Sequence, residues 1–114
     1  MKQTYKVKDR GELIDIIRNA KDNEDLNYLD VSKVENMRWM FYISKVNGDI
    51  SKWDVSKVEN MRWMFNNSKF NQDISNWNIS SECFYNSLKD SDFSNKTLKV
   101  IIDDFYKRIY YKNH

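Results

Sequence analysis

Proline is absent from this chain, glycine occurs only twice, and there is one cysteine and one histidine. With no proline and only Gly11 and Gly48, the sequence has no flexible linker, so we expect its 114 residues to form one domain. The single thiol of Cys83 excludes an internal disulfide and is typical of a reducing compartment. The only histidine is the last residue, His114, which argues against a histidine-based catalytic triad or metal site.

Charge and hydropathy argue against further classes. The net charge is +2, from 19 basic and 17 acidic residues that are mixed along the chain, so no strong field favours nucleic acid or a membrane surface. No segment is long and apolar enough to span a membrane, and the first residues lack the apolar stretch of a signal peptide. We therefore expect a cytoplasmic protein. The only histidine is terminal, neither glycine lies in a phosphate-binding pattern, and Cys83 has no sequence context that suggests activation. We therefore expect no enzyme, no cofactor and no small-molecule substrate.

The sequence does contain a repeat. The run DVSKVENMRWMF begins at residue 30 and again at residue 54, unchanged, which sets a period of 24 residues. Leu29, Trp53 and Trp77 share one position of this period. A fixed period between 20 and 50 residues indicates a solenoid, in which each unit buries its apolar face against the next.

Within a unit the hydrophobic spacing changes. Trp53 and Val55 flank Asp54, an alternation that predicts a short strand with the two apolar side chains inward. The apolar residues at 58, 61, 64 and 65 then follow a helical spacing. The prediction is an α/β repeat, a short leucine-rich-repeat-like solenoid with parallel strands on one side and short helices on the other.

The segments outside the clear repeats are predicted to be caps. We expect an N-terminal cap over residues 1–28, repeats at 29–52 and 53–76, a degenerate repeat at 77–93 and a C-terminal capping helix at 94–114. Asp9 and Glu12 form a capping box that predicts a helix whose apolar residues begin at Leu13. In the degenerate repeat, Tyr85 and Leu88 take the positions of Met61 and Met64 and are expected to point inward.

The runs NGDISKWDVSKVENMRWMF and FNQDISNWNIS carry a family resemblance. Over residues 29–78 the chain resembles the repeat of BspA-like bacterial leucine-rich-repeat proteins. That resemblance implies a solenoid that binds other molecules and has no catalytic machinery. Many such proteins are long surface lipoproteins or adhesins, and shorter cytoplasmic ones occur on phages and mobile elements. This chain has no N-terminal lipid-accepting cysteine and only two clear repeats, which favours the second group over adhesion.

Two surfaces of the predicted solenoid are candidates for binding a protein. On the helix side, Trp39 and Trp63 lie opposite the buried face, each beside an arginine, Arg38 or Arg62. Exposed tryptophan and arginine are typical of interface hot spots, although the two indoles could instead stack into an outer ladder that stabilises the repeat. On the strand side, the outward positions form a second candidate ladder of Tyr28, Asp30, Lys52, Asp54, Asn76 and Asn78. The alternative for these residues is a polar sheet face with local hydrogen bonds and no binding role.

The C-terminal segment is a candidate for binding nucleic acid. Basic and aromatic side chains together bind RNA or single-stranded DNA through phosphate contacts and stacking. Here the candidates are Lys99, Tyr106, Lys107, Arg108, Tyr110, Tyr111 and Lys112. Cations near the end of a helix are also ordinary partners of the helix dipole.

These observations favour a non-enzymatic protein-binding module that acts by occupying a surface of its partner. The more specific hypothesis is a phage or mobile-element inhibitor of a host defence protein, such as a CRISPR effector nuclease or its ribonucleoprotein. The alternatives are a surface adhesion or structural repeat module and an RNA-binding accessory protein. Neither the partner nor the face that it contacts follows from the sequence.

Overall fold

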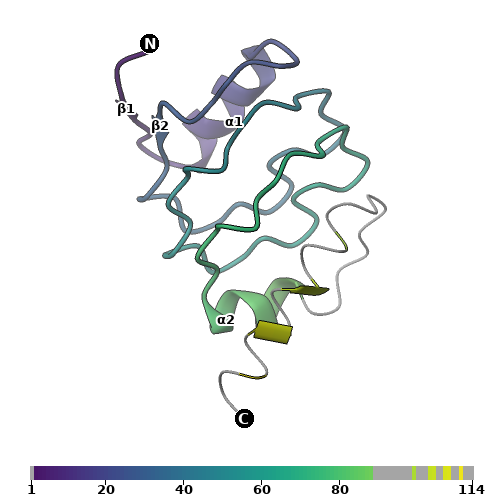
Figure 1. Ribbon diagram of the computed structural model, residues 1–114. Helices are drawn as coiled ribbons and strands as arrows, with labels where there is room; N and C mark the ends of the chain where they lie inside the picture. Colours follow the sequence, from purple (N-terminus) through teal and green to yellow (C-terminus); the bar gives the residue numbers. More distant parts are fainter. Residues whose placement is uncertain (1, 89–98, 100–102, 105–106, 109–110, 112–114) are drawn as a thin grey trace.

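A computed structural model describes residues 2–88, 99, 103–104, 107–108 and 111. Its elements are strand β1 (Tyr5–Lys6), helix α1 (Arg10–Asn19), strand β2 (Leu29–Asp30), helix α2 (Ser81–Cys83) and the π-helical turn η1 (Phe84–Leu88). The two strands pair in parallel, with Tyr5 opposite Leu29. In Figure 1, α1 and α2 lie at opposite ends of the molecule, and residues 31–80 fill the space between them.

Helix α1 begins where the sequence predicted. Asp9 has an extended backbone, and its carboxylate accepts the N–H of Glu12 at 2.9 Å. The Glu12 side chain reaches back to the N–H of Lys8, one residue earlier than in a standard capping box. Leu13 and Ile17 are buried, so α1 packs its apolar face onto the repeats as expected.

The helices expected within the two repeats are not present. Residues 37–44 (the first turn run) and 61–68 (the second turn run) form consecutive β-turns. In the first turn run the N–H groups of Met40, Tyr42 and Ser44 each donate to the carbonyl three residues earlier, at 3.0–3.2 Å. Each run also contains residues with left-handed backbone angles: Trp39 and Ile43 in the first, Trp63 and Asn67 in the second. A left-handed residue interrupts the right-handed helix, so the helical prediction was wrong.

The N–H groups of the first run that do not close turns form hydrogen bonds to the second run. Met37 donates to the carbonyl of Asn60 at 2.8 Å, and the pairs Trp39 with Arg62, Phe41 with Met64 and Ile43 with Asn66 follow at 2.8–3.2 Å. Backbone donors thus alternate along the first turn run, one bonding within a turn and the next bonding to the neighbouring run. In an α-helix all N–H groups after the first four would donate within the same segment. The apolar spacing is compatible with both arrangements, which explains the error.

The strands expected at 53–55 and 77–79 are also absent. The N–H of Trp53 donates to the carbonyl of Ile50, so the chain turns here instead of extending. Leu29 does lie in a strand, but its partner is the N-terminal β1 and not the next repeat. The predicted alternation of side chains is confirmed, since Trp53 and Val55 are buried and Asp54 is exposed. The leucine-rich-repeat-like solenoid itself stays a prediction.

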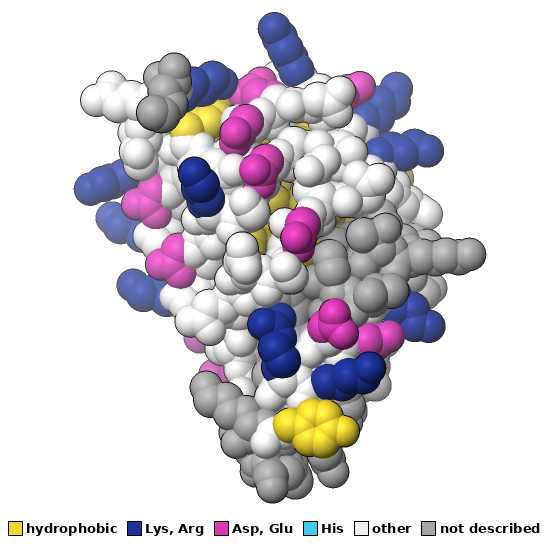
Figure 2. All heavy atoms as spheres, viewed as in Figure 1, with side chains coloured by type: hydrophobic (Ala, Val, Ile, Leu, Met, Phe, Trp, Pro, Cys, Tyr) yellow, Lys and Arg dark blue, Asp and Glu magenta, His cyan; other side chains and the backbone are white. Residues whose placement is uncertain are grey.

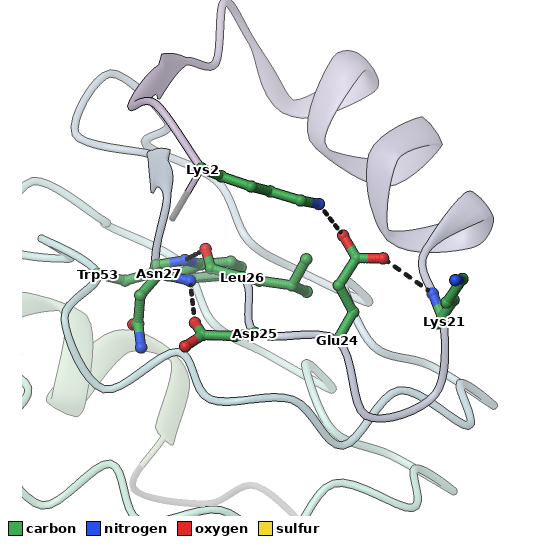
Figure 3. Close-up of polar contacts among 7 residues, drawn as sticks. All are labelled: Lys2, Lys21, Glu24, Asp25, Leu26, Asn27 and Trp53. Atoms are coloured by element: carbon green, nitrogen blue, oxygen red, sulfur yellow. Dashed lines mark hydrogen bonds and ion pairs between the residues drawn. The ribbon is translucent and has the colours of Figure 1, made fainter.

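Equivalent apolar side chains of the repeats form one core. Trp53 and Trp77 are each 3% exposed, and their rings lie 6.4 Å apart and nearly parallel. Each indole N–H donates to a backbone carbonyl 27 residues earlier, at 2.9 Å: Trp53 to Leu26 and Trp77 to Ile50. Figure 3 shows the first of these bonds. Repetition therefore satisfies the buried indole donors as well as filling the core.

Both ends of the paired turn runs meet other elements. At one end the hydroxyl of Ser87, in η1, accepts the N–H of Met61 at 3.0 Å, as the carbonyl of Asn60 does for Met37. At the other end the guanidinium of Arg10, in α1, donates to the carbonyl of Arg38. Helical elements thus provide side-chain partners for backbone groups at the edges of the repeats.

The degenerate repeat differs from its prediction in one respect. Cys83, Phe84 and Ser87 form the buried face of α2 and η1, whereas Tyr85 is 43% exposed. Ser80 caps α2 by accepting the N–H of Cys83, which sets this helical phase. Tyr85 consequently points away from the position of Met61. The side chain of Leu88 and the apolar stripe of the predicted capping helix at 94–114 lie outside the described residues.

The segment between α1 and β2 is held to the repeats through Glu24. Its carboxylate pairs with Lys2 at 2.7 Å and accepts the N–H of Lys21, as Figure 3 shows. The pKa of Glu24 is lowered, mainly by the hydrogen bond from Lys2. Its backbone carbonyl lies directly against Gly48, where an added Cβ would stand 1.7 Å from the oxygen. Glycine is required at 48 because of this close approach.

We predict that Gly48→Ala lowers the free energy of unfolding by about 1–3 kcal/mol, because two backbone segments must separate to admit a methyl group. Gly11→Ala is the matched control. A Cβ at Gly11 meets only Asp9 Oδ1 at 3.6 Å, and alanine favours the helix, so its stability should be unchanged or slightly higher. Urea unfolding of the two variants measures the difference. Equal losses in both would contradict the contact between Gly48 and Glu24.

Candidate functional site

The most exposed large apolar side chains of the repeats lie together on the first turn run. Trp39 is 37% exposed, Tyr42 44% and Ile43 62%. The Trp39 ring stacks on that of Trp63, with centroids 5.5 Å apart and planes 14° apart, and meets Tyr42 edge-on at 4.8 Å. We call Trp39, Tyr42, Ile43 and Trp63 the aromatic patch. The outer ladder of indoles is therefore present, and part of it remains open to solvent.

Arginines border this patch. The Arg62 guanidinium lies 5.6 Å from the centre of the Trp63 ring, a cation–π distance. The backbone N–H groups of Arg38 and Arg62 donate to the side chains of Asn36 and Asn60, at 2.9 and 2.8 Å. These local bonds orient both arginines in the same way at the start of each turn run. Both side chains are exposed, so the predicted Trp–Arg pairs lie on one surface.

A groove adjoins the patch on the side of α1. It has a volume of about 590 Å³. Its wall on the helix side comes from α1 and the residues after it, and its other wall comes from the first turn run and the residues that follow. The lining residues are Arg10, Ile14, Ile17, Arg18, Ala20, Asp22, Trp39, Met40, Tyr42, Ile43, Ser44, Lys45 and Val46. The lining combines apolar side chains from both walls with three basic residues and one acidic residue.

Five residues of this surface were missed from the sequence: Tyr42, Ile43, Arg10, Arg18 and Lys45. A signal for the first two was available. Directly after the identical run, the first repeat has Tyr-Ile where the second has Asn-Asn. The two repeats are identical up to this point, and then the first has an apolar pair where the second has a polar pair. The apolar pair is exposed. The three basic residues carried no such signal, because only the fold brings α1 beside the first turn run.

The predicted strand-side ladder has a different character. Asp30 accepts both the N–H and the hydroxyl of Ser32, at 3.0 and 2.6 Å, and Asp54 accepts the same groups of Ser56. The hydroxyl bonds are the main reason that the pKa of each carboxyl lies below its usual range. The negative charge of Asp30 opposes this shift at Asp54. Both carboxylates are thus engaged in their own turns, as the local hydrogen-bonding alternative supposed.

Among the described residues, no hydrogen bond, ion pair or ring contact joins the other members of that ladder to one another. Tyr28 is half-buried, and its ring lies 4.3 Å from the Lys2 ammonium. Lys52 is exposed, and its backbone N–H donates to Asn27. Asn76 and Asn78 are exposed. On the face shown in Figure 2, basic and acidic side chains are interspersed, and no field of one sign dominates it.

The structure describes four of the seven C-terminal residues that are candidates for binding nucleic acid. Lys99, Lys107, Arg108 and Tyr111 are exposed and helical, and Arg108 donates to the carbonyl of Ser75 at 3.2 Å. Tyr106, Tyr110 and Lys112 lie outside the described residues.

The described part of the chain offers few side chains suited to catalysis or to metal binding. It contains no group of three or more His, Cys, Asp or Glu side chains that could hold a metal ion. Cys83 is buried, and burial raises the pKa of its thiol. The thiolate is the nucleophilic form, so this environment opposes reactivity. Among the described helices, none has the length and apolar content needed to cross a membrane.

Comparison with family models gave one match. The model described as "Mycoplasma protein of unknown function, DUF285" matches residues 11–99. The chain belongs to this family. The DUF285 match begins inside α1 and includes both turn runs, so it contains the aromatic patch and most of the groove. No curated protein and no solved structure matched the chain.

We predict that the aspartate–serine bonds make stability depend on pH in the acid range. Because the folded pKa values of Asp30 and Asp54 are lowered, their contribution is complete above the unfolded value, near pH 4, and is lost as the pH falls through the folded values. The double variant Ser32→Ala/Ser56→Ala should be less stable than the parent at pH 7, and the difference should narrow at pH 2.5. Urea unfolding at both pH values measures it, and a difference that does not change with pH would contradict this origin.

Proposed function

We propose that this chain is a non-enzymatic protein-binding module that acts by covering a surface of its partner through the aromatic patch. The observation that supports the proposal is the exposed stack of Trp39 on Trp63, with Tyr42 and Ile43 beside it and Arg62 over one ring. Tryptophan, tyrosine and arginine are the residues that most often dominate binding energy at protein interfaces.

The geometry suits recognition because the anchors are already ordered. Each indole sits on a turn that is fixed by backbone hydrogen bonds to the neighbouring run, so little conformational entropy remains to be lost on binding. The stack also presents two aromatic rings and a guanidinium as one rigid unit. A rigid unit of this kind acts by steric occupation and needs no chemical step.

In its specific form the proposal is a cytoplasmic phage or mobile-element inhibitor of a host defence protein, such as a CRISPR effector nuclease or its ribonucleoprotein. Its support is the resemblance of the repeats to those of BspA-like proteins and the small size of the chain. In this reading the two repeats form a short solenoid whose outer ladder is the binding surface.

We predict that Trp39→Ala/Trp63→Ala weakens capture of the partner by at least about tenfold, as expected for loss of hot-spot residues. The measurement is an affinity pull-down from lysate of the bacterial host, with and without nuclease, read by mass spectrometry. Tyr85→Ala is the matched control, because it removes an aromatic ring of similar exposure outside the patch.

The melting temperature of each variant separates binding from folding. Loss of the indole stack should destabilise the fold by about 0.5–1.5 kcal/mol, which leaves the protein folded at assay temperature. If the double variant is folded and captures the same protein as the parent, the patch is not the binding surface. Capture that disappears with nuclease would favour the RNA-binding alternative, and with it Lys107 and Arg108.

A further inference from the structure

The direction of the backbone carbonyls in the first turn run follows from comparison with the equivalent carbonyls of the second run. In the second run, the carbonyls of Arg62, Met64 and Asn66 accept N–H groups from the first. The equivalent carbonyls of the first run belong to Arg38, Met40 and Tyr42. Both runs have the same turn bonds and the same left-handed positions, so these oxygens point away from the second run, toward α1.

Only one of these three oxygens meets a donor. The carbonyl of Arg38 accepts the Arg10 guanidinium, which confirms the direction. Within the described part of the chain, no backbone or side-chain donor reaches the oxygens of Met40 or Tyr42. Both residues line the groove beside α1. Two residues that line the groove thus have carbonyls without a donor, and they lie two residues apart, the spacing at which an extended backbone directs successive N–H groups to the same side.

Apolar side chains lie on both walls of the groove, and its volume of about 590 Å³ has room for a large side chain. Ile14 and Ile17 of α1 form one wall, and the aromatic patch forms the opposite rim. At this rim Ile43 has a φ of 55°, a left-handed angle that β-branched residues rarely adopt, whereas the second run has Asn67 in the same position. A strained, exposed isoleucine where asparagine fits the backbone better indicates a functional surface.

The charges of the groove define the partner further. Arg10, Arg18 and Lys45 line it against one acidic residue, Asp22. The Nε–H of Arg10 is buried and has no acceptor among the described residues. A buried donor without a partner costs free energy, and a carboxylate is the acceptor that pairs most strongly with a guanidinium.

We propose that this groove binds an extended acidic segment of a partner protein. The segment donates backbone N–H groups to the carbonyls of Met40 and Tyr42 and so occupies the place of a preceding turn run. A large apolar side chain packs between α1 and the aromatic patch, and carboxylates pair with the three basic residues of the groove. This inference rests on the proposed protein-binding function and specifies the partner's chemistry.

A random 12-residue peptide library displayed on phage tests the proposal. Selection on the full chain should enrich peptides that contain Asp or Glu together with a large apolar residue. The enriched peptides, made synthetically, should bind Arg18→Glu/Lys45→Glu at least about tenfold more weakly, because both substitutions oppose acidic ligands. Lys33→Glu/Lys57→Glu, which makes the same charge change outside the groove, should bind as the parent does.

Backbone methylation of the best peptide tests the hydrogen bonds directly. Methyl groups on alternate backbone nitrogens give two matched peptides, and one of them should bind at least about fivefold more weakly than the other, because it loses both donors. Equal affinity of the two would overturn the backbone pairing. Failure to enrich peptides, enrichment of basic peptides, or equal binding to the Arg18→Glu/Lys45→Glu variant would overturn the acidic occupant.

Self-association gives a further decisive result. If sedimentation shows a dimer of the parent that Arg18→Glu/Lys45→Glu abolishes, the occupant is a second copy and the proposal is wrong. The proposed function can survive any of these failures, because a pull-down that depends on Trp39 and Trp63 requires only the patch. If capture of the partner does not depend on Trp39 and Trp63, but acidic peptides still bind the groove as proposed, the proposed function of the patch fails and the groove remains as the binding surface.

Discussion

The structure depends on how the backbone donors of the repeats are divided. Along each turn run, alternate N–H groups close turns, and in the first run the others cross to the second. A turn run therefore cannot satisfy its own backbone, and it needs a neighbour with the same spacing of acceptors. This requirement explains why the two runs have the same turns and the same left-handed positions. It also explains why a helix packs at each end, with Arg10 and Ser87 supplying side-chain partners to the edges.

The exposed aromatic patch follows from the same division. Residues at equivalent positions of two hydrogen-bonded runs lie side by side, so Trp39 must stack on Trp63 outside and Phe41 on Phe65 inside. The stack on Trp63 covers one face of the Trp39 ring and holds the two runs together. Trp39 nevertheless remains 37% exposed. What is specific to the first run is the Tyr-Ile pair that follows it. The patch and the groove meet at these two residues, so the part of the repeat that differs is the part that shapes this surface.

Sequence reasoning identified the buried positions well and the backbone poorly, for one physical reason. Burial follows from hydropathy at a fixed period, so Trp53, Val58 and Met61 were assigned correctly to the core. The conformation of the backbone depends on the acceptor to which each N–H donates, which hydropathy does not reveal. Apolar residues three and four positions apart can share one buried face in consecutive turns as well as in a helix. Tryptophan and isoleucine at left-handed angles gave no warning, since neither favours them. The groove was not predictable because it requires α1 and the first turn run to be placed together.

The identity of the two runs has a consequence for folding. Either copy of the run offers the same edge to its neighbour, so local hydrogen bonding and local hydropathy do not distinguish the correct register from one displaced by a whole repeat. Selection of the register falls to contacts that occur once, such as Gly48 against the carbonyl of Glu24 and the hydroxyl of Ser87 on Met61. Contacts that occur once therefore select the pairing of the two runs that the structure shows.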